Sequence, residues 1–166
     1  KDHGRSAKYL KYLGKELALQ SGYLEGSHDV VQLHWGGGTP TFLSHDEMRQ
    51  LMGSIREHFH LQPSGEYSIE VDPRKVDEAT VALLGELGFN RMSLGVQDFD
   101  LAVQEAVNRV QTVEETESVL RAARANGFKS ISVDLIYGLP KQNVISFNRT
   151  LEEVIRLSPD RLSIYN

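Results

Sequence analysis

Cysteine is absent from this chain of 166 residues. Without a thiol, the chain can form no disulfide and can offer no thiolate nucleophile. Iron–sulfur clusters and cysteine-bound zinc therefore cannot be held by these residues. The histidines show no spacing typical of metal ligands, so the sequence predicts no metal ligand of its own.

Long apolar runs are also absent. No stretch approaches the roughly 18 residues that cross a bilayer, and the charged opening Lys-Asp-His-Gly-Arg-Ser is not typical of a signal peptide. Acidic residues outnumber basic ones, which gives a formal net charge of −5. Because binding to phosphates needs a basic face, nucleic acid is excluded as the main partner, and no membrane partner is expected.

What the chain does contain is an alternation of two kinds of apolar segment. Helical spacing marks residues 7–19, a segment after Ser44, residues 77–87, a segment from Thr112, and a segment that stops before Pro159. Strand-like runs lie between these segments: Val30–Trp35, Tyr67–Val71, Arg91–Val96, Ser130–Ile136 and Arg161–Tyr165. Strands separated by single helices are parallel. The sequence therefore predicts a single α/β domain over residues 1–166 with a curved parallel sheet, either an open layer or part of a barrel.

Local signals fix several helix ends. Ser44 with Glu47, and Thr112 with Glu115, have the spacing of a capping box, which predicts that a helix begins after each. Gly88 and Gly127 follow apolar helical patterns and predict helix ends.

The segment Leu33–Thr41 reads Leu-His-Trp-Gly-Gly-Gly-Thr-Pro-Thr, a triple glycine directly after a strand. Glycines let the backbone approach a ligand closely and adopt angles that a Cβ forbids. A strand, a glycine turn and a helix is how α/β proteins cradle a cofactor, although a plain tight turn would have the same composition.

Polar residues recur at the predicted strand exits. Ligands of parallel sheets bind at the carboxyl ends of strands, so we expect these residues to share one rim. They are Gly36, Gly37, Gly38 and Thr39 after the first strand, Glu70, Asp72 and Arg74 at the second, Gln97, Asp98 and Arg109 after the third, and Asp134 in the fourth.

Glu70 and Asp134 are acidic residues inside otherwise apolar strands. A buried carboxylate is costly unless it is paired or bound, so either could form an internal salt bridge with Arg109. The alternative is a zwitterionic ligand with hydroxyl groups, whose ammonium, carboxylate and ribose hydroxyls would meet Glu70, Arg109, and Asp134 or Gln97. His34 and Trp35 could equally pack beneath the turn or contact a substrate.

Five segments together resemble oxygen-independent coproporphyrinogen III oxidase, a radical S-adenosylmethionine (SAM) enzyme of haem biosynthesis. They are Leu33–Thr41, Ile69–Arg74, Leu94–Phe99, Val107–Gln111 and Val133–Gln142. Related haem chaperones share the glycine turn but usually have Asn-Pro and Gln-Ser where this chain has Asp72-Pro73 and Gln97-Asp98. The resemblance therefore favours the oxidase, with a chaperone that binds haem and SAM as the alternative.

The resemblance implies a (β/α)₆ partial TIM barrel with a [4Fe–4S] cluster and two SAM molecules in its mouth. It also implies an electron donor and acceptor, a reducing cytoplasm, and oxidative decarboxylation of two propionates of coproporphyrinogen III by a 5′-deoxyadenosyl radical. The SAM-binding residues of the family correspond to Gly37, Gly38, Thr39, Glu70, Gln97, Arg109 and Asp134.

One departure from the family is large. The cluster of the family is held by a Cys-x3-Cys-x2-Cys loop that this chain does not contain. We expect the chain to be the central part of a longer protein that supplies this loop, and to be inactive alone. A phosphate- or sugar-binding α/β enzyme, with the triple glycine as an anion site, is a further alternative.

Overall fold

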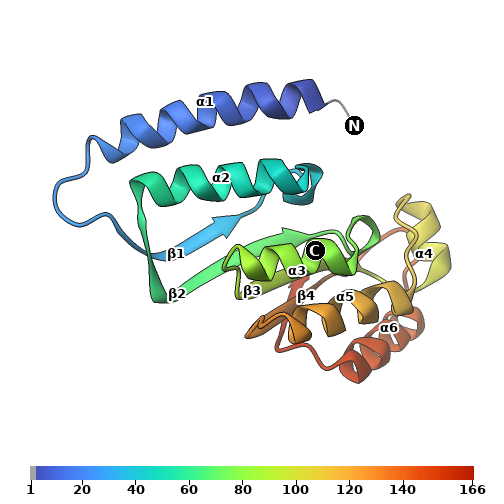
Figure 1. Cartoon of the computed structure of the whole chain (residues 1–166). Helices are drawn as coiled ribbons and strands as arrows, with labels where there is room; N and C mark the ends of the chain where they lie inside the picture. Colours follow the sequence, from blue (N-terminus) through green and yellow to red (C-terminus); the bar gives the residue numbers. More distant parts are fainter. Residues whose placement is uncertain (1–2) are drawn as a thin grey trace.

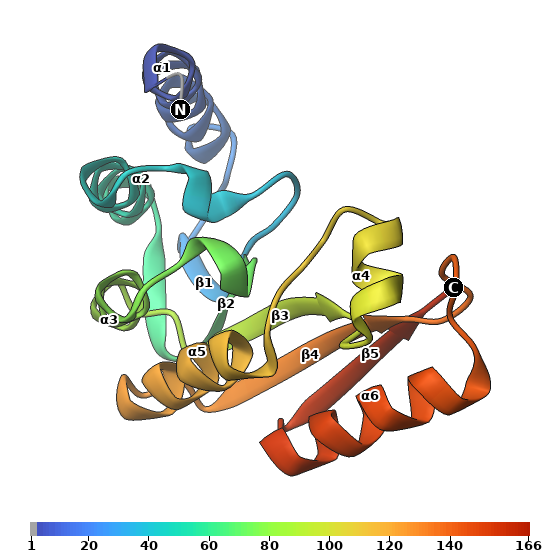
Figure 2. The ribbon, with the colours of Figure 1, turned by 90° about the vertical axis from the view of Figure 1, so that its right-hand side faces the viewer.

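The computed structural model describes residues 3–166 and has an α/β architecture. Five strands form one sheet in the order β1-β2-β3-β4-β5, and every neighbouring pair is parallel. Figure 2 shows that the sheet curls like half of a barrel with helices around its outside, which confirms the predicted curved parallel sheet. The strands are β1 (Asp29–Trp35), β2 (His60–Val71), β3 (Arg91–Gln97), β4 (Ser130–Ile136) and β5 (Arg161–Tyr165).

Helices connect the strands and cover the convex face of the sheet (Figures 1 and 2). The main helices are α1 (His3–Ser21), α2 (His45–His58), α3 (Glu78–Glu86), α5 (Val113–Ala125) and α6 (Val144–Leu157). The short helix α4 (Leu101–Ala106) and the 3-10 turns η1 (Pro40–Phe42) and η2 (Pro73–Lys75) lie in the connections that follow β3, β1 and β2. Among residues 3–166, no helix combines the length and the apolar content that a membrane span requires.

The helix ends predicted from local sequence signals are present in the structure. The capping boxes at Ser44 and Thr112 are formed, each with the glutamate three residues on bonding back to the cap. Gly88 and Gly127 both have positive φ, at +96° and +83°, the backbone conformation that ends a helix at low cost in glycine.

The strands have two different faces. Alternate residues such as Ile69, Leu94 and Val133 are fully buried under the helices. The residues between them point to the concave face, which is polar and carries Ser68, Glu70, Ser93, Ser132 and Asp134 at half-exposed or exposed positions. The core therefore lies outside the curl, and the concave side is open to a ligand.

Strand β2 begins seven residues before the predicted start at Tyr67. Its first part pairs Leu61 with Val30, and the pairing then resumes at Glu66 with Gln32. The extra residues bulge out of the ladder and include Pro63 and Gly65, two residue types that weaken a regular strand.

Candidate functional site

The carboxyl ends of four strands surround a cavity of about 190 Å³. Six of the seven residues predicted to bind SAM line it, and they come from five different loops and strands. They are Gly38, Thr39, Glu70, Gln97, Arg109 and Asp134, accompanied by Pro40, Val71, Asp72, Ser93 and Gly95. The seventh, Gly37, is adjacent, because its backbone N–H donates to Glu70 Oε2 at 3.1 Å. The structure thus brings the predicted residues together; their binding role stays a prediction.

The glycine turn that follows β1 needs its glycines for backbone reasons. Gly37 and Gly38 have φ angles of +71° and +57°, in the left-handed region that other residues enter at a cost. A Cβ on either would point into open space, so the angle and not crowding requires glycine there. Gly36 differs: a Cβ there would lie 2.8 Å from Glu70 Oε1.

Glu70 lies at the exit of β2 on the concave face. Its Oε2 accepts the Gly37 N–H, and its Oε1 is 3.3 Å from His34 Nε2. The Glu70 side chain is 48% exposed, so its carboxylate has room for a further donor.

Asp134 lies on the concave face of β4, where it pairs with Gly95 in the ladder. Its Oδ2 accepts a 2.7 Å hydrogen bond from the Ser93 hydroxyl of the neighbouring strand. The interpretation of Glu70 and Asp134 as buried carboxylates was wrong, because both belong to the polar concave face and not to a strand covered on both sides. Ser93 was missed; the polar alternation of Ser-Leu-Gly-Val-Gln along β3 was its signal in the sequence.

Arg109 reaches the cavity from the loop after α4. Its Nη2 donates to the Gly95 carbonyl oxygen at 2.7 Å, and a Cβ on Gly95 would come within 3.0 Å of the same nitrogen. Its ion-pair partner is Asp72, at 3.7 Å, and not Glu70 or Asp134. The Nε atom is buried and has no hydrogen-bond partner among the described residues, so the guanidinium keeps unused donor capacity.

Asp72 and Arg74 form a network that the sequence patterns did not reveal. Arg74 donates to both carboxylate oxygens of Asp72, at 2.9 and 2.7 Å, and its backbone N–H adds a third bond at 3.1 Å. Burial alone would raise the pKa of Asp72, but the Arg74 hydrogen bonds and the charge of Arg109 together hold it below its ordinary value. Burial lowers the pKa of Arg109, against the attraction of Asp72. One carboxylate thus faces two guanidinium groups and leaves a positive charge at this side of the cavity.

Gln97 and Asp98 have different roles although they are adjacent. Gln97 lines the cavity from an irregular position in the ladder and has a φ of +72°. Asp98 was expected on the same rim but is only 1% exposed. The bend at Gln97 turns Asp98 away from the cavity and into the protein. There its carboxyl group accepts hydrogen bonds from Thr150 Oγ1 at 2.7 Å and from Gln142 Nε2 at 2.5 Å.

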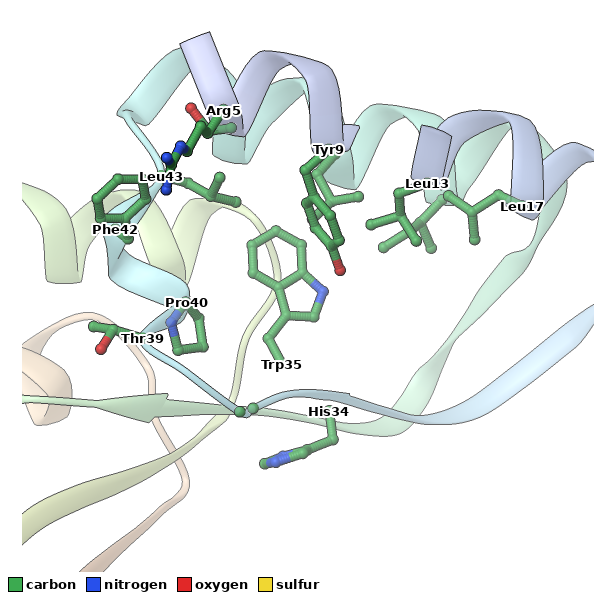
Figure 3. A pocket seen from close by; sticks show the side chains of 15 residues that line it. Arg5, Tyr9, Leu13, Leu17, His34, Trp35, Thr39, Pro40, Phe42 and Leu43 are labelled. Carbon is green, nitrogen blue, oxygen red and sulfur yellow. The ribbon is translucent and has the colours of Figure 1, made fainter. Parts of the chain in front are cut away.

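A second, larger cavity of about 560 Å³ lies on the other side of the glycine turn, between α1, α2 and the end of β1. Figure 3 shows Trp35 pointing up into it beneath Tyr9, whereas His34 points to the opposite side of β1. Trp35 packs edge-on against Phe89 with ring centroids 4.9 Å apart. It therefore has the packing role that the sequence suggested as one of two alternatives, the other being contact with a substrate.

The depressed pKa of Asp72 makes stability depend on pH. A group whose pKa is lowered in the folded state contributes stability above its ordinary value, near 3.9 for aspartate, and this contribution is lost as the pH falls through the folded-state pKa. We expect Asp72→Asn to lower the free energy of unfolding by about 2 kcal/mol at pH 7 and by progressively less below about pH 4. Denaturant titrations at pH 7, 5, 4 and 3 measure this.

Asp46→Asn is the matched control for this experiment, because the Asp46 side chain is 99% exposed. It is expected to lower the free energy of unfolding by no more than about 0.5 kcal/mol, because its pair with Arg49 and its place in the first turn of α2 are exposed to solvent. A deficit of Asp72→Asn that is as large at pH 3 as at pH 7 would contradict the assigned role of this carboxylate.

The described residues offer one clear limit on the chemistry of the site. Within residues 3–166, no three histidine, cysteine, aspartate or glutamate side chains gather closely enough to hold a metal ion. The donor set of the smaller cavity, with carboxylates, a guanidinium, an amide and hydroxyls, suits an organic zwitterion with hydroxyl groups.

Known proteins have similar sequences and the same fold. The chain is 57% identical, over its whole length, to the oxygen-independent coproporphyrinogen III oxidase of Pseudomonas aeruginosa, and 47% identical, over 98% of its length, to that of Escherichia coli. The solved structure of coproporphyrinogen III oxidase (HemN) from E. coli, described as a radical SAM enzyme, superposes with a TM-score of 0.95 at 45% identity over the whole chain. The chain spans 36%, 35% and 38% of these three proteins.

The family assignment also rests on the match to a family model. Residues 16–154 match the Radical SAM superfamily, a range that includes all seven predicted SAM-binding residues. The chain belongs to the radical SAM superfamily.

Proposed function

We propose that this chain is the central part of an oxygen-independent coproporphyrinogen III oxidase, which converts two propionate side chains of coproporphyrinogen III to the vinyl groups of protoporphyrinogen IX. The observation that carries the proposal is the 57% identity to the P. aeruginosa enzyme across the whole chain. The cavity at the strand exits supports it, because it presents the polar groups that the resemblance requires.

The residues of the cavity fit SAM. The cradle of Gly37 and Gly38 is open where side chains would stand, and Arg109 has a buried Nε without a partner among the described residues. We propose that Glu70 accepts hydrogen bonds from the SAM ammonium group, Arg109 donates to its carboxylate, and Asp134 or Gln97 binds its ribose hydroxyls. Two SAM molecules are expected in the full-length enzyme, and the stoichiometry of binding tests this number.

Bound SAM supplies the hydrogen-abstracting chemistry. The contribution of this chain is orientation: complementary charges at the two ends of an amino acid fix how it lies, so that the reacting carbon meets its target and side reactions are limited. Closely spaced strand exits serve this purpose well, because the sheet holds them rigidly.

The residues of this chain do not fit a [4Fe–4S] cluster, because none is a cysteine. We propose that a cysteine loop elsewhere in the full-length enzyme holds the cluster. An electron donor and an electron acceptor are the further partners proposed for the full-length enzyme, in a reducing cytoplasm.

The test is anaerobic reconstitution of the full-length enzyme with iron and sulfide, followed by SAM cleavage with and without coproporphyrinogen III. We expect a stoichiometric cluster, SAM cleavage that depends on substrate, and a vinyl product. The 166-residue chain treated in the same way should take up no cluster and cleave no SAM. Haem binding without a vinyl product would support the chaperone instead, and a cluster on the cysteine-free chain would contradict the proposal.

A further inference from the structure

We propose that His34 is a positioning residue that fixes the orientation of the Glu70 carboxylate for its ligand. The inference rests on the proposed function, because Glu70 is the residue proposed to hold the SAM ammonium group. We call His34 and the Gly37 N–H the Glu70 clasp. The predicted SAM-binding set does not include His34.

The clasp holds one carboxylate oxygen from each side. Gly37 N donates to Oε2 at 3.1 Å, and His34 Nε2 lies 3.3 Å from Oε1. Both partners belong to β1 and the turn that follows it, whereas Glu70 is on β2. Contacts at both oxygens restrain the rotation of the carboxylate about its terminal bond and favour set directions for its remaining lone pairs.

The first glycine of the motif makes room for the clasp. A Cβ on Gly36 would lie 2.8 Å from Glu70 Oε1 and closer still to His34 Nε2. Gly37 and Gly38 meet no such obstacle. The three glycines therefore serve two purposes: the first admits the His34–Glu70 contact, and the other two permit the left-handed turn.

The other ring nitrogen anchors the imidazole to the sheet. His34 Nδ1 is 2.8 Å from the hydroxyl of Ser68, the residue that pairs with it in the ladder between β1 and β2. The Ser68 hydroxyl is also 3.3 Å from the Leu33 carbonyl oxygen. The Ser68 hydroxyl has one proton, so it donates either to Nδ1 or to the Leu33 carbonyl oxygen, and the contact with Nδ1 is the shorter of the two. When Ser68 donates to Nδ1, a neutral imidazole carries its proton on Nε2, where it is donated to Glu70.

The surroundings of His34 favour this pairing. Figure 3 shows that its ring lies on the face of β1 opposite Trp35, although the residue also lines an edge of the larger cavity. The charged groups of the shallow hollow beside it, Glu66 and Arg91, form an ion pair with each other. Glu70 is thus the acidic partner that remains for His34, and the 55% exposure of the His34 side chain indicates that it adds little to the core.

Two conservative substitutions test the contacts of the two ring nitrogens separately. In glutamine, Nε2 is as many bonds from Cβ as in histidine, so His34→Gln can still reach Glu70. In asparagine, Nδ2 matches Nδ1, so His34→Asn can reach Ser68 but not Glu70. Both variants are compared with Glu70→Gln, Ser68→Ala and the double variant His34→Asn/Glu70→Gln.

The measurement is the Kd of SAM for the reconstituted full-length enzyme, by anaerobic calorimetric titration, with the thermal midpoint of each variant. We expect His34→Asn to weaken SAM binding about tenfold, as the loss of an orienting charge-assisted contact does, and His34→Gln to stay within about twofold of wild type. Ser68→Ala should weaken binding by less than His34→Asn. The double variant should bind no more weakly than Glu70→Gln alone, because His34 acts through Glu70.

Each other outcome has a definite meaning. Wild-type affinity in His34→Asn overturns the inference, and so does a further loss in the double variant, which would show His34 acting on SAM directly. Equal losses of affinity and thermal midpoint in His34→Gln and His34→Asn would show a merely structural role. Wild-type affinity in Glu70→Gln would instead overturn the proposed role of Glu70, which is a different failure.

Discussion

Glu70→Ala and Arg109→Ala are each expected to weaken SAM binding by the full-length enzyme by roughly ten- to a hundredfold. Each removes a charge-assisted contact worth about 1.5–3 kcal/mol. Turnover should fall with affinity, while the fold and the cluster content stay intact, because both side chains line the cavity at the strand exits and are only partly buried. Binding and the thermal midpoint are measured on the same preparations.

Arg74→Ala is the matched control for Arg109→Ala. Both arginines pair with Asp72, but only Arg109 lines the cavity. Arg74→Ala should therefore lower the thermal midpoint and leave the Kd of SAM near the wild-type value. If Arg109→Ala behaves in the same way, losing stability but keeping SAM affinity, then Arg109 is a structural partner of Asp72 and its assignment to SAM is wrong.

Asp98→Ala is expected to lower the free energy of unfolding by about 3 kcal/mol or more. Its carboxyl group accepts hydrogen bonds from Thr150 Oγ1, Gln142 Nε2 and the backbone N–H of Asp100. The residue is 1% exposed, and each buried donor left without a partner costs about 1–3 kcal/mol. Because these bonds tie the exit of β3 to α6 and to the loop after β4, Gln97 should also lose order in the cavity.

The control is a pair of Asp→Asn substitutions two residues apart. Asp98→Asn places an amide where an acceptor is needed and should be clearly destabilising. Asp100→Asn should be nearly neutral, because Asp100 caps α4 through one side-chain oxygen and asparagine caps equally well. The free energies of unfolding of the wild type, Asp98→Ala, Asp98→Asn and Asp100→Asn are measured by denaturant titration. An Asp98→Ala variant within about 1 kcal/mol of wild type would show that the donors find other partners.

Sequence patterns were sufficient for the parts of the fold that depend on local chemistry. The capping boxes at Ser44 and Thr112, the glycine helix ends and the strands after Arg91 are set by neighbours within a few residues, and the structure has them where they were predicted. The shared rim followed from topology, because parallel strands end on the same side. Gly38, Glu70 and Asp134 therefore meet although they are far apart in the chain.

Features that depend on which side of the sheet a residue lies, or on contacts between distant segments, could not be predicted from the sequence. Glu70 and Asp134 were read as buried because the residues beside them are apolar, yet alternate residues lie on opposite sides of a sheet. The pairing of Arg109 with Asp72, the inward turn of Asp98 and the contact of His34 with Glu70 all join residues that are distant in sequence. The first half of β2 was missed because its bulge places Pro63 and Gly65 inside a strand.

The small side chains of the concave face have a consequence for space. In closed barrels the interior is filled by large branched residues packed in layers. Here Ser68, Ser93, Ser132 and Ser163 occupy the inner positions of four strands, and Ser132 and Ser163 even reach each other at 3.2 Å. These short hydroxyl side chains find hydrogen-bond partners on the sheet, such as Asp134 for Ser93, without projecting far from it. Because the serine side chains are short, they leave the space on the concave side of the sheet unfilled. That space is then available to a ligand.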